Sequence, residues 1–377
     1  MGDLTGALRL RAVHRAIAEL RRGMPVVLAT QGAEADLVLL AAEVAGTQGL
    51  AALQRSADAE PVLLLASTRA GAVLKRPEPE EMPAVVPLRL PAALLAPEAL
   101  RRLADPTLEQ TRPAEPEAVA TEPSGDESAA REAALSLAKI GRLLPAVLAA
   151  PLRAAARDGA AAPPLVEVRQ ADVAGYPYAA AVTLMRVAEA RVPLADAPDA
   201  RIVAFRVPAS GVEHLAILVG RPEEAPVPLV RMHSECFTGD VLGSLRCDCG
   251  QQLRGAIKRM GEEGEGILLY LAQEGRGIGL VNKLRAYALQ DRGLDTLDAN
   301  RALGWGADER SFLVAATMLE ALGVKRLRLL TNNPDKVEAL RACGVDVTER
   351  LPHVFAPNGI DDHYLETKAR RFGHLLD

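Results

Sequence analysis

Three cysteines lie close together in the second half of the chain, within the segment RMHSECFTGDVLGSLRCDCG. A short loop separates Cys236 from Cys247 and Cys249, which have one residue between them. Thiolates are strong zinc ligands, so this spacing indicates one ion held by three sulfurs. A catalytic zinc site leaves one position open for water, whose pKa the ion lowers toward neutrality. The pattern therefore predicts a hydrolytic zinc centre.

A closed structural zinc site is the alternative interpretation, with His233 or Asp248 as the fourth ligand. The surroundings argue against it, because a structural site needs no crowd of polar groups, yet polar side chains gather here: His233, Ser234, Glu235 and Asp240. The fourth cysteine, Cys343, stands far along the chain inside an expected helix. We interpret it as a small core residue.

Three further segments have the residue types that handle phosphate. QEGRGIG, at 273–279, combines glycines that let a ligand approach the backbone with Arg276, whose guanidinium can bind phosphate in a bidentate manner. TNNPDK opens an expected helix with Thr331 and Lys336, which suits an anion or an ordinary Asn-Pro turn with a cap. In GADERS, Asp308 and Arg310 can project to the same side, as a functional or a surface ion pair.

The elements that must position these residues alternate between helix and strand. In the second half we expect helices and strands at 250–263, 266–271, 280–291, 311–322, 326–330, 335–342 and 345–349. The 266–271, 326–330 and 345–349 segments are the strands, and loops at their carboxyl ends carry the candidate residues. In the first half we expect helices at 13–22, 35–45 and 131–143 and strands at 25–29 and 61–66.

Length and composition set the wider limits. A chain of 377 residues suggests two domains, which we place at 1–175 and 180–377. A stretch at 106–128 is rich in Pro, Glu, Ser and Thr and should be a flexible connection or insertion, and a shorter break follows at 158–164. A net charge of −5 without basic clusters argues against nucleic acid. No apolar stretch is long enough to cross a membrane, so a cytoplasmic enzyme is expected.

In order and spacing, the motifs RMHSEC, TGD, SLRCDCG, QEGRGIGL, NKLRAYALQD, GADER and TNNPDK resemble the GTP cyclohydrolase II family of riboflavin biosynthesis. The resemblance runs from about Arg186 to the closing HYLETKARRFGHLL, roughly half of the chain. It implies the α/β fold of that family with a zinc-binding loop. It also implies hydrolysis of GTP to a diaminopyrimidine, with release of formate and pyrophosphate.

The resemblance also implies roles at matching positions. Cys236, Cys247 and Cys249 would hold a catalytic Zn²⁺ whose water attacks carbon 8 of guanine, and Mg²⁺ would accompany the triphosphate. Arg310 matches the family's proposed nucleophile on the α-phosphate and Asp308 its proton acceptor, although arginine is almost never deprotonated. Tyr287 matches an active-site tyrosine. The residues implied in GTP binding are Arg231, Met232, His233, Ser234, Glu235, Gln252, Glu274, Gly275, Arg276, Thr296, Thr331 and Lys336. Family members are homodimers.

The sequence departs from the family pattern at two places, and both bear on the substrate preference and the reaction rate. Ala272 stands where an arginine commonly precedes QEGRG, and the early Pro-Thr and Tyr-Gly elements are replaced by VPLADAPDARIVAF. A related cyclohydrolase acting on another nucleotide is therefore one alternative. A non-catalytic zinc knuckle that binds a partner is another, but it predicts interleaved aromatics and a basic face, and aromatics make up 3% of this chain.

The first half resembles a reduced α+β domain of the 3,4-dihydroxy-2-butanone 4-phosphate synthase family. The matching segments are AIAELRRGMPVVLAT, EADLVLLAAEV and REAALSLAKIGRLLPAVL. Of the acidic metal-binding loop of that family only Glu34 and Asp36 remain, and 23–175 contains no His and no Cys. Divalent-metal enolisation needs several oxygen ligands and an acid–base group. We expect a catalytically inactive scaffold that helps dimerisation or positions the other half.

Overall fold

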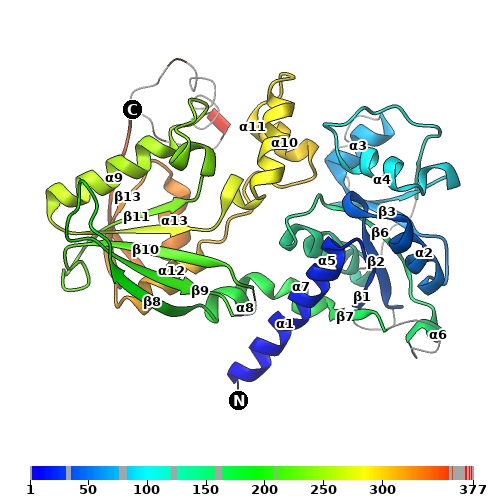
Figure 1. Cartoon of the computed structure of the whole chain (residues 1–377), viewed down its shortest axis with the longest axis horizontal. Helices are drawn as coiled ribbons and strands as arrows, with labels where there is room; N and C mark the ends of the chain where they lie inside the picture. Colours follow the sequence, from blue (N-terminus) through cyan, green and yellow to red (C-terminus); the bar gives the residue numbers. More distant parts are fainter. Residues whose placement is uncertain are drawn as a thin grey trace. The chain divides into compact units, whose positions relative to one another are not determined.

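The computed structural model describes residues 2–30, 35–75, 83–119, 125–157, 164–208 and 210–355, together with 359, 370, 371, 373 and 375. It divides into two compact units, each built around its own sheet (Figure 1). The first unit comprises Met1–Tyr176 and Val281–Ala307, and the second comprises Pro177–Leu280 and Asp308–Asp377. The division therefore does not follow two simple halves of the chain.

The first unit is an α+β domain with one seven-stranded sheet, in the order β5-β4-β3-β6-β2-β1-β7. Neighbouring strands are antiparallel except β1 and β7. Its strands are β1 (Val26–Ala29), β2 (Leu37–Ala41), β3 (Val62–Ala66), β4 (Val85–Arg89), β5 (Glu117–Ala118), β6 (Ala146–Pro151) and β7 (Val166–Arg169). Its helices before residue 177 are α1 (Gly2–Arg21), η1 (Ala42–Val44), α2 (Thr47–Ser56), α3 (Ser67–Leu74), η2 (Ala92–Leu94), α4 (Pro97–Ala104), α5 (Gly125–Ile140), α6 (Ala154–Arg157) and α7 (Gln170–Ala174).

The sheet order of the second unit is β14-β13-β11-β12-β10-β9-β8, with β14, β13, β11 and β12 parallel and the remaining pairs antiparallel. Its strands are β8 (Met185–Arg191), β9 (Arg201–Arg206), β10 (Glu213–Val219), β11 (Leu229–Ser234), β12 (Gly266–Leu271), β13 (Arg326–Leu330) and β14 (Asp346–Leu351). Its helices are α8 (Tyr176–Val182), η3 (Phe237–Val241), α9 (Cys249–Glu263), η4 (Glu274–Gly277), α12 (Leu313–Ala321) and α13 (Pro334–Ala342).

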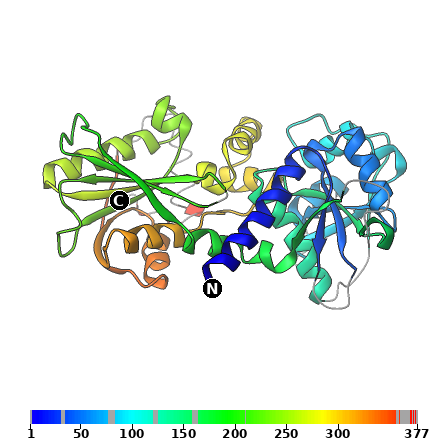
Figure 2. The same ribbon diagram turned by 60° about the horizontal axis from the view of Figure 1, so that its bottom comes forward.

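Helices cover both faces of the second sheet. The crossover through α9 leads from β11 to β12, and the one through α12 leads back past β11 to β13. Because such crossovers are right-handed, opposite directions place their helices on opposite faces. Figure 2 shows this arrangement, with α9 on one side of the sheet and the orange helices α12 and α13 on the other. The inner parallel strands β11 and β12 are thus buried nearly throughout, whereas the edge strand β14 is largely exposed.

Two helices of the family-like half, α10 (Leu280–Gln290) and α11 (Thr296–Ala302), belong almost wholly to the first unit. The expected helix at 280–291 is confirmed. It falls within the expected domain 180–377, whereas in the structure nearly all of it belongs to the first unit. The functional division at 1–175 and 180–377 stays a prediction.

Most expected elements are present, and one is wrong. The helix expected at 35–45 is instead β2 followed by the short η1. Val38 to Ala41 are fully buried, because β2 lies inside the sheet between β1 and β6. A short apolar run that is covered on both faces resembles a helical segment in sequence, and strand pairing decides the outcome.

The segment expected to be flexible is an insertion within the first unit. Its part at 106–116 has no regular structure, β5 follows, and α5 already begins at Gly125. Gln110 Nε2 donates to the carbonyl of Asp105 at 3.1 Å, so this part is held by hydrogen bonds. The break at 158–163 and most of the closing segment lie outside the described residues, as does Glu34. No helix within the described ranges has the length and apolar character that a membrane crossing needs.

Candidate active site

The candidate residues of the second unit gather where parallel strands end. β13, β11 and β12 are adjacent and parallel, so their carboxyl ends lie along one edge of the sheet. The segment Arg231–Cys236 ends β11, Gln273–Arg276 follows β12, and Thr331 follows β13. A backbone hydrogen bond of 2.8 Å from Glu235 to Leu271 joins the first two of these segments.

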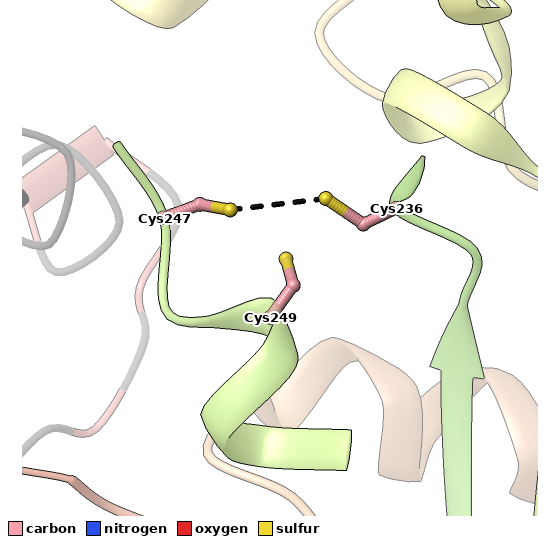
Figure 3. A group of neighbouring side chains, drawn as sticks. All are labelled: Cys236, Cys247 and Cys249. Atoms are coloured by element: carbon pink, nitrogen blue, oxygen red, sulfur yellow. Dashed lines mark hydrogen bonds between the residues drawn. The ribbon is translucent and has the colours of Figure 1, made fainter. Parts of the chain in front are cut away.

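The three cysteines converge at this edge (Figure 3). Cys236 follows β11, Cys247 lies in the loop that leads to α9, and Cys249 is the first residue of α9. Their sulfurs lie within 4.8 Å of one another, and the Cys236 and Cys247 sulfurs are 3.8 Å apart. In the described part of the chain the cluster has three members, so neither His233 nor Asp248 completes it.

The cluster fits a tetrahedral zinc ion with one open position. Zinc–sulfur bonds of about 2.3 Å at tetrahedral angles hold two sulfurs about 3.8 Å apart, which is the separation of Cys236 and Cys247. Hydrogen bonding to Cys236 raises the pKa of Cys247 to about 11, and the negative charge of Cys236 adds to this effect. Cys236 thus opposes the ionisation of Cys247, whereas hydrogen bonds to Cys249 favour it, and a bound cation would favour it further.

Gly239 makes room for the cluster. A Cβ at this position would lie 2.8 Å from the sulfur of Cys247 and 3.1 Å from that of Cys236. On the other side, a Cβ on Gly250 would lie 2.2 Å from the carbonyl oxygen of Gly239. The two glycines allow the loop after β11 to pack directly on the first turn of α9, which brings Cys249 to its partners.

Asp240 organises the loop that carries Cys236. One of its carboxylate oxygens accepts hydrogen bonds from the backbone amide of Cys236 at 2.9 Å and from the hydroxyl of Tyr270 at 2.9 Å. Nε2 of His233 lies 3.1 Å from both carboxylate oxygens, and the rings of His233 and Tyr270 stack with centroids 5.6 Å apart. Burial lowers the pKa of His233 despite the nearby carboxylate. His233 is therefore engaged with Asp240 rather than with the sulfurs.

The QEGRGIG loop has an unusual backbone. Gly275, Arg276, Gly277 and Gly279 all have positive φ, and Arg276, at 61°, is one of three such non-glycine residues in the described chain. A non-glycine residue in this region is strained, which is common at functional sites. Glu274 fixes the loop, since its carboxylate accepts from the amide of Phe237 at 2.7 Å. The loop therefore packs on the cysteine segment.

Asp308 and Arg310 form an ion pair at the same edge. Nε of Arg310 donates to the Asp308 carboxylate at 2.8 Å, and Nη1 reaches the hydroxyl of Ser234 at 3.4 Å. Glu309, between them, donates its amide to the carbonyl of Arg276 at 3.0 Å. Burial alone would raise the pKa of Asp308, but the hydrogen bonds and charge of Arg310 outweigh it and hold the pKa below its ordinary value. The pair is thus a carboxylate and a guanidinium beside the cysteine segment.

A network of buried polar side chains stabilises this edge of the sheet. Arg231 donates to the carbonyl of Leu330 at 3.2 Å and to the side chain of Gln252, which in turn donates to Asp248. Burial lowers the pKa of Arg231 to about 10. Nε of Arg231 has no hydrogen-bond partner among the residues that the structure describes, and such a buried donor is costly to leave unpaired. This nitrogen is available to donate a hydrogen bond to a ligand.

The segment after β13 forms the N-terminal cap of α13, as one interpretation of its sequence predicts. Asn333 accepts the amide of Asp335 at 2.9 Å and is the N-cap of α13, and Thr331 Oγ1 accepts the amide of Asn333 at 3.1 Å. The ammonium of Lys336 donates to the carbonyl of Met232 at 2.9 Å. The cap interpretation of TNNPDK is confirmed, and Lys336 holds this segment against β11.

Two of the candidate residues lie in the first unit. Tyr287 is on α10, with Lys283 Nζ 5.7 Å from the centre of its ring. Thr296 opens α11, and its hydroxyl lies 3.4 Å from Nε2 of Gln290. Cys343, expected in the core, is only half-buried at the end of α13.

Sequence reasoning missed the parts that Gly239 and Tyr270 play in the site, and it named Asp240 only as one of several polar side chains near the cysteines. The TGD motif between the cysteines was a signal for Gly239 and Asp240, since a glycine beside an acidic residue indicates close packing and an anchored turn. Tyr270 lies within the apolar GILLYL strand, and only the pairing of β11 with β12 brings it to Asp240.

Comparisons of the sequence with known proteins identify its family. The family model described as GTP cyclohydrolase II matches residues 185–352. A GTP cyclohydrolase-2 from Azospirillum brasilense is 49% identical over 372 residues, which cover 97% of this chain and 94% of that protein. The chain belongs to the GTP cyclohydrolase II family.

Other GTP cyclohydrolase II relatives match the second half alone. The GTP cyclohydrolase-2 of Shigella boydii is 53% identical over 194 residues, which cover 52% of this chain and 98% of that protein. Among solved structures, a two-domain 3,4-dihydroxy-2-butanone 4-phosphate synthase from A. baumannii covers 91% of this chain and 99% of its own, with a TM-score of 0.34 and 17% identity. The family is zinc-dependent in general, and the three thiols are donors that fit this ion.

Proposed function

We propose that the chain hydrolyses GTP to 2,5-diamino-6-(5-phosphoribosylamino)pyrimidin-4(3H)-one, formate and pyrophosphate, the first step of riboflavin biosynthesis. The observation that carries this proposal is the cluster of Cys236, Cys247 and Cys249, whose sulfurs lie within 4.8 Å of one another. It lies at the sheet edge that also holds the Asp308–Arg310 pair. Membership in the GTP cyclohydrolase II family supports the identity of the substrate.

The three thiolates would hold Zn²⁺, which supplies a water of lowered pKa for attack on carbon 8 of guanine. Cys249 begins α9, so the positive end of the helix dipole favours its thiolate. Asp240 holds the Cys236 backbone through two hydrogen bonds: its carboxylate accepts from the Cys236 amide at 2.9 Å, and its own amide donates to the Cys236 carbonyl at 2.7 Å. These contacts hold the segment that carries the Cys236 sulfur.

The phosphates are the second part of the proposal. Arg276, Arg310 and the unpaired Nε of Arg231 provide positive charge and donors at one edge of the sheet. Arg310 would meet the α-phosphate, and Asp308 would hold its guanidinium in place and take up a proton as pyrophosphate leaves. The remaining binding roles are proposed for Met232, His233, Ser234, Glu235, Gln252, Glu274, Gly275, Thr296, Thr331 and Lys336, with Tyr287 as a catalytic residue.

The family pattern extends the proposal to the assembly. Mg²⁺ would neutralise the triphosphate, two copies of the chain would form a homodimer, and the enzyme would work in the cytoplasm. The first unit would be an inactive relative of the dihydroxybutanone phosphate synthases, since 23–175 contains no His and no Cys.

The direct test measures formate and pyrophosphate released from GTP by the zinc-loaded full chain with Mg²⁺. Cys247→Ser is the matched variant, because it removes one sulfur and changes little else. We expect both products from the unchanged chain and neither from the variant. Zinc bound at one ion per chain without any product would refute the proposed reaction, and conversion of ribulose 5-phosphate would refute the inactive first unit.

A further inference from the structure

The segment Val281–Ala307 lies inside the family match yet belongs to the first compact unit. Its two ends join the site loops directly. It begins after Leu280, which follows the QEGRGIG loop, and it ends before Asp308. The segment also includes Tyr287 and Thr296, which have proposed roles in the reaction. Whatever holds this segment therefore acts on residues of the proposed site.

One ion cluster within the first unit fixes α10. Nη2 of Arg285 lies 2.8 Å from Oε1 of Glu43, and its Nε lies 2.8 Å from Oδ2 of Asp105. The Arg285 side chain is 19% exposed, that of Glu43 15% and that of Asp105 9%, so water screens the cluster little. Loss of one partner from such a cluster leaves an uncompensated charge, which is strongly destabilising.

Both carboxylates are held in place by other groups. The second oxygen of Glu43 accepts the amide of Leu144 at 2.6 Å. Oδ1 of Asp105 accepts the amide of Thr107 at 2.9 Å and its hydroxyl at 2.6 Å. Each carboxylate thus offers a fixed oxygen to Arg285, and little side-chain freedom is lost when the guanidinium binds.

Additional contacts join the segment to the same unit. Asn282, fully buried, donates to the carbonyl of Arg142 at 3.2 Å, and it accepts from Arg285 at 2.8 Å. Arg292 donates to the carbonyl of Thr107 at 2.8 Å. Trp305, 4% exposed, lies with its ring centre 5.7 Å from Nζ of Lys139. The segment is therefore attached near both of its ends.

We infer that the N-terminal unit is the anchor of residues 281–307, and that Arg285 is the positioning residue through which this unit sets the affinity for GTP. The inference rests on the proposed function. Tyr287 lies two residues after Arg285, about 200° around the helix, so Arg285 makes its contacts on the side of α10 away from Tyr287. An unanchored segment would have to be ordered whenever GTP binds, which weakens binding more than it slows the bound reaction. This gives the first unit a role without any synthase chemistry.

The test uses the full chain with Glu43→Gln, Arg285→Gln and the double variant. Glu98→Gln is the matched control, because Glu98 forms an exposed ion pair with Arg102 in the same unit. We expect faster amide exchange across 281–307 and a KM for GTP raised about tenfold, with kcat changed by less than about twofold. The double variant should be no worse than either single one, since Glu43 acts through Arg285.

Arg285→Lys provides a second, milder variant that keeps the charge and loses the two-pronged geometry, and it should fall between the unchanged chain and Arg285→Gln. Unchanged exchange in 281–307 in Arg285→Gln would overturn the anchor. An unchanged KM, or effects that add fully in the double variant, would overturn the positioning role. If the unchanged chain releases no formate from GTP, the proposed function fails, and the exchange measurement still decides whether the anchor exists.

Discussion

Replacement of Gly239 by alanine changes the space around the three sulfurs without removing any of them. The added Cβ would lie 2.8 Å from the sulfur of Cys247, 3.0 Å from the Cβ of Cys249 and 3.1 Å from the sulfur of Cys236. Ordinary contacts between such atoms are about 3.5–4.0 Å, so the Cys247 sulfur would have to move by about 0.7 Å or more. The φ of Gly239 is not in the left-handed region, so alanine causes no backbone strain there.

A zinc site tolerates ligand displacements of about 0.2 Å, so the variant must distort either the metal geometry or the packing of its loop. Overpacking of this kind costs about 1–3 kcal/mol, which corresponds to a zinc dissociation constant raised about tenfold to a hundredfold. Competition with a chromogenic chelator measures that constant directly.

Gly125→Ala is the matched control, because no atom of the described residues lies within 4 Å of its added Cβ and its φ is ordinary. It should bind zinc as the unchanged chain does. Undiminished zinc affinity in Gly239→Ala would show that the sulfurs do not hold the ion in the arrangement described, and would refute the reasoning.

Three further predictions concern the second unit. Asp240→Asn should weaken zinc binding about tenfold to a hundredfold, because it disturbs the support of Cys236, and the same competition assay checks it. Arg310→Gln should raise the pKa of Asp308, because burial is then opposed only by the amide of residue 310 and the charge of Arg276, and a carboxyl NMR titration would show no change if the pair is unimportant. Burial, aided by nearby charge, lowers the pKa of His353 from 6.5 to about 4, so the unfolded chain binds the extra proton first. Stability should therefore be full above about pH 6.5 and fall toward pH 4, and His353→Asn should flatten this part of the Tm profile.

Much of the site could be predicted from sequence because its residues lie in short local motifs. The spacing of Cys236, Cys247 and Cys249 indicates a shared ion, and the structure brings their sulfurs together. The approach of Asp308 and Arg310 to the cysteine segment was not readable from spacing. It depends on the loop after β12, whose Arg276 carbonyl receives the amide of Glu309.

Other features depend on pairing across long distances in the chain. The run from Leu37 to Ala41 fits a helix or a buried strand equally well by its apolar character, and its place between β1 and β6 decides for the strand. The attachment of 281–307 to the first unit is of the same kind. Arg285 gives no sign in sequence that its partners are Glu43 and Asp105, more than a hundred residues earlier.

A zinc titration of the metal-free chain tests the central claim most directly. Formate release from GTP, with Mg²⁺ present, is measured while zinc is added in steps and bound zinc is determined in the same samples. A single three-thiol site predicts that the rate rises in proportion to bound zinc and levels off at one ion per chain. Formate release by the metal-free chain, or a fully loaded chain that releases none, would contradict the account.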